Sequence, residues 1–574
     1  MLVVLALVAA GLVATVGRSS APAGSVTSAN GAGGVHGIAL TYARAKAEGR
    51  TADYQWGAGC DTATGRLRLP MAGGFPCIAR QAGSNGGATW SGVTATAITV
   101  ALYEPAPGGL TTALAGATDP PAAVRATARA FVAMLNAIVP LHGRKVVLVP
   151  YQATGGSSDA VAGRADAITV AQSLHAFASI GGPQQTSAYE DELARLHVLC
   201  VGCGLSVPYA GYRQDAPYLW GDLPTPDTLL TDALDFVVAD LVGRDATYAG
   251  EAAFRHEKRR FALVHYDQNP PLYGGLTKKL DKEFAATKLR LVDNESYLLD
   301  LPQLPSEAAT IAAHLKASGA TTVIFAGDPI MPIFLTKAAA AIGYFPEWVV
   351  TGTVLTDTST LGRLYDPQEW AHAFGISTLP VPTPAAQSIG RSLYRWYYGT
   401  EPAAIKTASL ILTPILLLYT GLELAGPRLT PDSFRAGMFE YPPSGGSPTN
   451  PRVAYGSQGA PPLPAYTTPA DYTVIWWDAN AVGPDEQGAV GRGLFRYVDG
   501  GRRYPAGKPP PAHLPLFSKA GTVTSYGSGS APGERVPAAP PWPGSPAALK
   551  AGSSAGGGST AGTAGAAGAA GAAG

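Results

Sequence analysis

Amide and hydroxyl side chains form a short run at one point of the chain: Gln184, Gln185, Thr186 and Ser187. They follow an apolar run at residues 177–180 and a Gly-Gly-Pro turn, and a segment with helical spacing comes directly after them. Hydroxyl groups and free backbone N–H groups at the start of a helix suit a small ligand that carries negative charge. The alternative is an ordinary turn between a strand and a helix, in which Ser187 caps the helix and Glu190 completes a capping box.

The four cysteines form two close pairs in the sequence, Cys60 with Cys77 and Cys200 with Cys203. The first pair brackets a polar loop with glycine and proline, and a disulfide that closes a loop of about 16 residues contributes roughly 3 kcal/mol. The second pair has the CxxC spacing of redox sites, but the Gly-Leu-Ser-Val-Pro segment after it does not begin a helix. A zinc site would need further cysteines or a nearby pair of histidines. We therefore predict two structural disulfides, with redox chemistry or zinc at the second pair as alternatives.

Motifs of catalysis do not occur in this sequence. There is no GxSxG nucleophile elbow, the glycines at 202 and 204 lack the third glycine of a dinucleotide-binding turn, and the nine histidines include no HExxH pair. We therefore expect a protein that is not an enzyme and uses no cofactor or metal. A two-lobed glycosyltransferase-like enzyme is the alternative.

Charge and hydropathy bound the partners and the location. The 574-residue chain has a formal net charge of +0 at pH 7, and only 14% of its residues are charged. This balance lacks the basic excess of nucleic-acid-binding proteins, so no nucleic-acid partner is expected. Residues 2–16 form an apolar run that is short for a membrane span, and the Ala-Pro-Ala at 21–23 suits a signal-peptidase site. Residues 1–23 are predicted to be an export signal, with an uncleaved membrane anchor as the alternative.

Apolar runs alternate with segments of helical spacing from Gly92 onward, which predicts parallel sheets with helices on both faces. The predicted strands are 98–103, 145–151, 177–180, 198–201, 261–266, 289–292, 322–326, 348–351, 372–377, 472–478 and 494–497. The strongly apolar segment 408–425 contains Pro414 and is predicted to be a buried helix rather than a membrane span. Residues 24–91 are predicted to be an extended segment that carries the Cys60–Cys77 loop.

Five stretches together resemble one known family. They are GVTATAITVALYEP (92–105), FASIGGPQQTSA (177–188), FALVHYDQNPPLYGG (261–275), VIFAGDP (323–329) and GYFPEWVVTG (343–352). In order and spacing they are similar to successive strands of the extracellular ligand-binding receptors with the type I periplasmic binding fold. These are the leucine-binding-protein-like substrate-binding proteins of branched-chain amino acid ABC transporters. The resemblance covers roughly residues 92–499.

The resemblance implies an α/β fold of two Rossmann-like lobes with parallel sheets, joined by a multi-strand hinge. The expected first lobe comprises 92–224 and 353–506, and the expected second lobe comprises 225–352. Residues 507–574 are rich in proline, glycine and alanine and are expected to form a disordered tail.

The resemblance also implies a site between the lobes for a small polar ligand, either amino-acid-like or an amide. Residues 184 to 187 occupy the positions of the family's carboxylate contacts, although the two glutamines stand where the family often has small residues. Ser206, at the end of the next strand, is a further candidate. In the second lobe Tyr273 is expected to cover the ligand. The candidates for pairing with a ligand amine are Asp267, Asp328 and Asp357, and each has a helix cap as its alternative role.

Because ligands bind beyond the carboxyl ends of parallel strands, the turn at 184–187 and the turn at 267–273 are predicted to face each other across the cleft. The expected partners are the small ligand and an ABC transporter permease, with a membrane tether through residues 2–16 as a possibility. The expected location is extracytoplasmic, either secreted or at the cell surface. The alternative function is a ligand-sensing receptor module at the cell surface with no role in transport.

Overall fold

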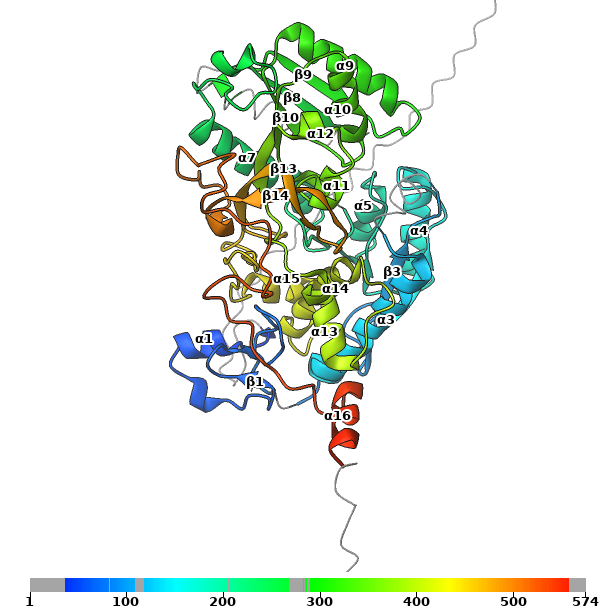
Figure 1. Ribbon diagram of the computed structural model, residues 1–574. Helices are drawn as coiled ribbons and strands as arrows, with labels where there is room; N and C mark the ends of the chain where they lie inside the picture. Colours follow the sequence, from blue (N-terminus) through cyan, green and yellow to red (C-terminus); the bar gives the residue numbers. More distant parts are fainter. Residues whose placement is uncertain are drawn as a thin grey trace, which may run out of the picture.

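The computed structural model describes residues 37–81, 83–108, 118–204, 207–267, 282, 284–285 and 290–556. Two α/β lobes are stacked along the long axis of the molecule, with the second lobe at the top of Figure 1 and the first lobe below it. Each lobe has its own sheet and its own hydrophobic core. The prediction of two lobes with parallel sheets is therefore confirmed.

The first lobe is built on five parallel strands in the order β4-β3-β5-β6-β7. The strands are β3 (Ala97–Glu104), β4 (Lys145–Gln152), β5 (Ala178–Ile180), β6 (Leu199–Val201) and β7 (Leu219–Trp220). The helices of this lobe are α3 (Pro121–Ile138), α4 (Ala160–Gln172), α5 (Ala188–Arg195), α6 (Tyr209–Gln214), α13 (Ile389–Tyr398), α14 (Ala408–Leu424) and α15 (Pro431–Phe439). The central strands β5 and β6 are entirely buried, as expected for a sheet with helices on both faces.

The second lobe is built on a sheet in the order β14-β13-β12-β11-β10-β8-β9, with β15 beside β13. The strands are β8 (Phe261–Tyr266), β9 (Asp293–Tyr297), β10 (Thr322–Ala326), β11 (Glu347–Val350), β12 (Ala373–Ser377), β13 (Asp471–Pro484), β14 (Val490–Tyr497) and β15 (Tyr504–Pro505). The helices are α7 (Pro226–Asp240), α9 (Leu304–Ser318), α10 (Met331–Ala341), α11 (Ser359–Gly362) and α12 (Pro367–Trp370). The pairing is parallel from β9 to β12 and antiparallel from β12 to β14.

The predicted end of the second lobe at residue 352 is wrong. Strands β12, β13 and β14 extend the sheet of the second lobe, although the prediction placed residues 353–506 in the first lobe. The chain passes between the two cores near residues 221–225, 382–392 and 467–471. Three crossings of this kind form the hinge of a two-lobed protein.

The N-terminal segment folds as a small unit at the lower end of the first lobe, shown in blue in Figure 1. It contains α1 (Tyr42–Ala47) and the hairpin of β1 (Cys60–Asp61) and β2 (Arg66–Leu67). Cys60 and Cys77 lie at bonding distance as predicted, with their Sγ atoms 1.97 Å apart and their Cα atoms 5.6 Å apart. The disulfide closes the loop that contains this hairpin.

Residues 507–556, here called the C-terminal strap, run along both lobes. Leu514 and Leu516 are buried in the core of the second lobe, and the Phe517 ring lies 4.8 Å from the Tyr248 ring. Farther along, the Trp542 ring lies 6.4 Å from the ring of Trp396 in the first lobe, and α16 (Pro546–Gly556) follows. The predicted start of the disordered tail at residue 507 is therefore wrong, and residues 557–574 lie outside the described part of the chain.

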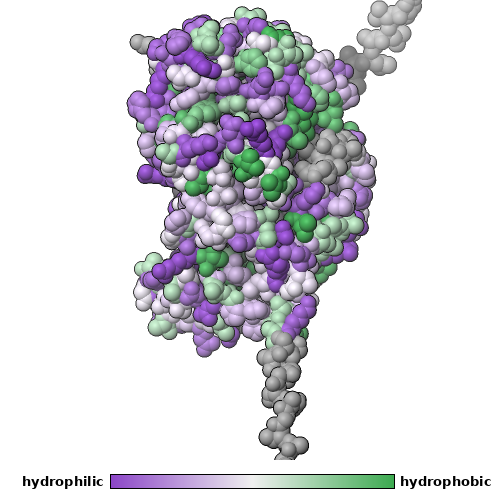
Figure 2. Space-filling model, viewed as in Figure 1, coloured by the Kyte–Doolittle hydropathy of each residue, from purple (hydrophilic) through white to green (hydrophobic). Residues whose placement is uncertain are grey.

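Helix α14 is the apolar helix that the sequence marks at 408–425. Leu412, Ile415, Leu418 and Leu422 on this helix are buried in the core of the first lobe, as predicted. Among the described residues, no helix has both the length and the apolar character that a membrane span requires. On the face shown in Figure 2, hydrophobic residues form small groups among hydrophilic ones.

Candidate functional site

The turn after β5 connects this strand to α5 at the carboxyl edge of the first sheet. Its first residue, Gly181, has a φ of +77°, a left-handed conformation that favours glycine. The Thr186 hydroxyl accepts a hydrogen bond from the Ala188 N–H at 3.2 Å, and the Ser187 hydroxyl donates to the Asp191 carboxylate at 2.9 Å. Both hydroxyls thus help to shape the start of α5.

The capping box predicted between Ser187 and Glu190 is wrong. Ser187 makes no side-chain cap bond to the backbone of α5. Glu190 points into the protein instead and is only 1% exposed, and one of its carboxyl oxygens has no partner among the described residues. This burial raises the pKa of Glu190 well above its usual range.

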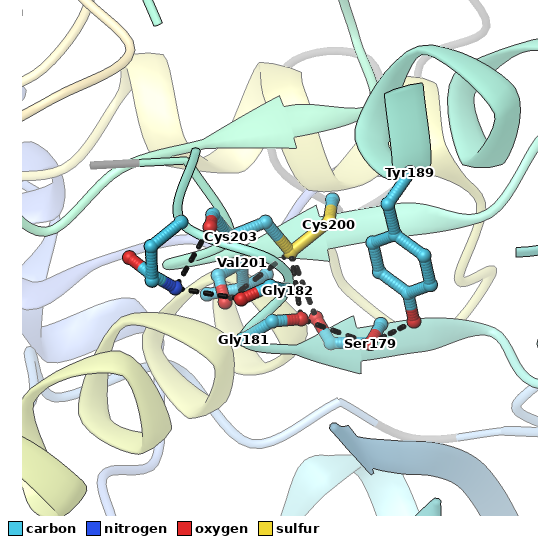
Figure 3. Close-up of a disulfide and its surroundings, with 8 residues drawn as sticks. Ser179, Gly181, Gly182, Tyr189, Cys200, Val201 and Cys203 are labelled. Carbon is cyan, nitrogen blue, oxygen red and sulfur yellow. Dashed lines mark hydrogen bonds between the residues drawn. A yellow bond between two sulfur atoms is a disulfide. The ribbon is translucent and has the colours of Figure 1, made fainter. Parts of the chain in front are cut away.

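The second cysteine pair lies directly beneath this turn (Figure 3). Cys200 and Cys203 have their Sγ atoms 1.92 Å apart, and both residues are buried. The Sγ atom of Cys203 lies 3.2 Å from the carbonyl oxygen of Gly181, while the Gln184 side chain donates a hydrogen bond to the Gly182 carbonyl at 2.6 Å. The disulfide therefore supports the turn from the neighbouring strand, which fits the predicted structural role. The described residues contain no group of side chains that suits a metal ion.

Gln185 is the residue of the turn that reaches the second lobe. Its side-chain amide donates a hydrogen bond to the Leu299 carbonyl oxygen at 3.4 Å and shares a hydrogen bond with the Tyr266 hydroxyl. On its own lobe, Gln185 accepts a hydrogen bond from the Ser157 hydroxyl and donates its backbone N–H to the Ser157 carbonyl at 3.0 Å. Gln185 is thus held by Ser157 in one lobe and touches two residues of the other.

The second lobe contributes the carboxyl ends of β8 and β9 to this meeting point. Tyr266 ends β8 and Tyr297 ends β9, and their rings lie 5.9 Å apart. Asp267 comes next in the chain, is partly exposed, and donates its backbone N–H to the Tyr297 carbonyl at 2.8 Å. Burial raises the pKa of Tyr266 to about 12, so its phenol stays protonated at neutral pH. The structure thus brings Gln185 of one predicted turn close to Tyr266, beside Asp267 of the other.

Asp328 and Asp357 have contacts inside the second lobe. The Asp328 carboxylate accepts hydrogen bonds from the Ile330 N–H at 2.7 Å, the Met331 N–H at 3.2 Å and the Tyr297 hydroxyl at 2.5 Å. Asp328 therefore has the helix-cap role that was the alternative for it. Asp357 is 0% exposed and accepts a hydrogen bond from Ser377 at 2.5 Å, and burial raises its pKa to about 7. A dissolved ligand reaches Asp357 only if the lobe rearranges.

Two of the predicted site residues, Ser206 and Tyr273, lie outside the described residues.

Comparison with known proteins identifies the family. The sequence profile of the family described as "Periplasmic binding protein" matches residues 109–468, which is more than half of the chain. The chain belongs to the periplasmic binding protein family. The match spans both lobes and ends before β13, so the N-terminal segment and the C-terminal strap lie outside it. No curated protein matches the sequence.

Solved structures show the same fold for this binding protein. It is similar to a leucine-, isoleucine-, valine-, threonine- and alanine-binding protein from Brucella ovis in a closed conformation, with 13% identity and a TM-score of 0.50 over 73% of this chain and 98% of that one. An ABC transporter substrate-binding protein from Aeropyrum pernix has 13% identity and a TM-score of 0.49 over 72% and 96% of the two chains. A solute-binding protein from Rhodopseudomonas palustris HaA2 in complex with p-hydroxybenzoic acid has 14% identity and a TM-score of 0.49 over 71% and 97%.

Membership of this family supports a solute-binding role for the protein. The family consists of solute-binding and receptor proteins rather than enzymes, and its members are extracytoplasmic. The resemblance stated from the sequence, including leucine-binding proteins among the relatives, is therefore confirmed.

Tyrosines near this periplasmic binding protein's cleft escaped the sequence analysis. Tyr103 and Tyr151 are register partners on β3 and β4, and both donate hydrogen bonds to Asp166 of α4, at 3.2 and 2.7 Å. The Tyr103 ring also lies 4.8 Å from the Tyr189 ring on α5. A tyrosine near the carboxyl end of two strands and another at the end of β8 form a pattern that the sequence does contain.

Proposed function

We propose that this protein is an extracytoplasmic solute-binding protein that captures a small polar ligand between its lobes and delivers it to an ABC importer. The observation that carries the proposal is the contact of Gln185 with both Tyr266 and Leu299. It places the turn at one sheet's carboxyl edge against the carboxyl ends of two strands of the other lobe. In open α/β sheets this edge is where ligands bind, and closing the lobes around a ligand draws on contacts from both sides.

The groups near this contact favour a ligand with both an acidic and a basic part, such as an amino acid or its amide. The turn at residues 181–187 offers amide donors and the start of α5. The Tyr266 phenol remains a neutral donor because of its raised pKa. On the second lobe, Asp267 is the predicted carboxylate that is partly exposed, whereas Asp328 and Asp357 are buried. Asp267 is therefore our proposed partner for a ligand amine.

Thermal-shift screening of the purified protein against amino acids, amides, short peptides and sugars tests this function. A ligand at 100 times its Kd adds about 2.7 kcal/mol of stability, which is a readily measured rise in melting temperature. We expect an amino acid or amide to give the largest rise. Stabilisation by sugars alone would contradict the proposed ligand class, and stabilisation by no compound in the panel would contradict the solute-binding function as proposed.

The substitution Gln185→Ala tests the place of the site. It removes the side-chain hydrogen bonds to the second lobe, each worth about 0.5 to 1.5 kcal/mol, so affinity for the ligand found in the screen should fall about 5- to 100-fold. The matched control is Gln172→Ala, because Gln172 is an exposed glutamine at the end of α4 in the same lobe. Isothermal titration calorimetry measures both variants. Equal affinity of the Gln185→Ala variant and the parent would place the site elsewhere.

A further inference from the structure

A second cavity lies far from the cleft, in parts of the chain that the family match mostly does not cover. Its volume is about 610 Å³, within the range of small-molecule sites. Three segments form its walls, namely the disulfide-closed loop with residues 61–74, the turn at residues 444–450 and the part of the strap at residues 532–537. The β1 hairpin of the first wall lies at the lower end of the molecule in Figure 1, whereas α5 of the cleft lies near the middle.

The three walls are tied together before any ligand binds. Arg66 donates hydrogen bonds to the Gly74 carbonyl at 2.6 Å, the Tyr441 hydroxyl at 3.1 Å and the Pro442 carbonyl at 2.5 Å, which fixes the loop to the first lobe. The Glu534 carboxylate accepts hydrogen bonds from the Thr449 N–H at 2.9 Å and the Ala531 N–H at 2.8 Å, which fixes the strap to the turn. A cavity with fixed walls binds without an ordering cost for the loops.

The charges that line this cavity are unevenly satisfied. The Asp61 carboxylate already accepts hydrogen bonds from the Ala63 N–H and the Thr64 hydroxyl, each at 3.0 Å. Glu534 and Arg66 are occupied by the contacts that tie the walls. The two remaining arginines, Arg68 and Arg535, have no hydrogen bond or ion pair within the part of the chain that the structure describes. The free polar groups of the cavity are therefore mainly guanidinium donors.

We propose that this cavity is a second binding site, which takes a small organic anion with a carboxylate or phosphate group held by Arg68 and Arg535. Guanidinium groups bind both kinds of anion through paired hydrogen bonds. Leu67, Met71 and Val536 in the same walls give an apolar surface for the body of the ligand. This site does not depend on the proposed function of the cleft, because it lies on different residues.

Calorimetric titration of the purified protein with three sugars of similar size tests the proposal. The probes are glucuronate, which carries a carboxylate, glucose 6-phosphate, which carries a phosphate, and uncharged glucose. We expect at least one anionic probe to bind more than about 10-fold tighter than glucose and its affinity to fall as salt is added. The anion that binds more tightly identifies the preferred head group. If neither anion binds more tightly than glucose, the proposal is overturned.

Arginine variants then assign the binding to the cavity. Replacing both residues, as Arg68→Ala with Arg535→Ala, should weaken anion binding by about 100-fold, since each charged hydrogen-bond partner is worth roughly a factor of 10. The control is Arg80→Ala, because Arg80 is an exposed arginine close to this loop that does not line the cavity. An unchanged affinity in the double variant, or an equal loss in the control, overturns the proposal. The ligand found in the cleft screen should bind the double variant as it binds the parent, so the two sites can fail independently.

Discussion

Leu514 makes the clearest test of whether the C-terminal strap is part of the folded protein. Its side chain is 7% exposed and belongs to the core of the second lobe. Its backbone is held as well, because the N–H groups of His513 and Leu514 donate to the Asp240 carboxylate at 2.6 and 3.3 Å. The substitution Leu514→Ala keeps these backbone bonds and removes only the packing of the side chain.

The expected loss of stability follows from that burial. Replacing a buried leucine by alanine costs about 2 to 5 kcal/mol, through the lost transfer of apolar atoms from water and the cavity that remains. Leu514 lies near the surface and the strap can partly move into the space, so we expect a value of about 2 to 3 kcal/mol. The cost is a sizeable part of the stability of an ordinary domain.

Urea unfolding followed by tryptophan fluorescence is a suitable assay, because the Trp476 ring lies 5.2 Å from the Phe517 ring of the strap. The control is Leu549→Ala, since Leu549 is on α16 of the same strap but is 66% exposed. The control should change the free energy of unfolding by less than about 0.5 kcal/mol. If Leu514→Ala changes it as little as Leu549→Ala does, the strap does not contribute to the core and the reasoning is refuted.

Two further predictions concern titration and covalent links. Burial raises the pKa of Glu423 on α14 to about 7, so between about pH 4.5 and 7 the folded state holds a proton that the unfolded state releases, and stability falls as pH rises through this range. Glu423→Gln should keep the hydrogen bond from the Leu141 N–H, now at 2.8 Å, and reduce that fall by up to about 3 kcal/mol, as measured by urea unfolding at pH 4.5 and 7.5; an unchanged slope would contradict the assignment. Replacing Cys60 and Cys77 together by alanine should lower the free energy of unfolding by about 3 kcal/mol, and mass spectrometry of the unreduced parent should find no free thiol at either position.

Elements whose apolar runs are continuous could be predicted closely from the sequence. Strands β8 and β10 begin and end at the predicted residues, because every residue of each strand is buried and the apolar run coincides with the strand. Strand β9 was predicted four residues too early, at 289–292. It lies at the edge of its sheet and has the polar sequence Asp-Asn-Glu-Ser-Tyr, so it lacks the apolar signal on which the prediction depended.

Features that depend on distant contacts could not be predicted in this way. The buried residues of the strap are isolated among prolines and glycines, and only the surface of the folded second lobe gives Leu514 and Phe517 their place. The lobe boundary failed for the same reason, since the membership of β13 depends on its pairing with β12. In the cleft, the turn itself was predicted, but the contact of Gln185 with Tyr266 depends on the angle between the two lobes.

The three crossings between the lobes also determine when the chain can finish folding during its synthesis. In the first lobe, the Trp220 ring packs 5.5 Å from the Phe434 ring and 5.2 Å from the Tyr466 ring, both of which follow most of the second lobe in the chain. The second lobe in turn needs β13, β14 and the start of the strap. Contacts between such distant residues form slowly and leave apolar surface open in the meantime. Neither lobe can therefore complete its core while the ribosome still holds the last quarter of the chain, and the newly made protein remains open for most of its synthesis.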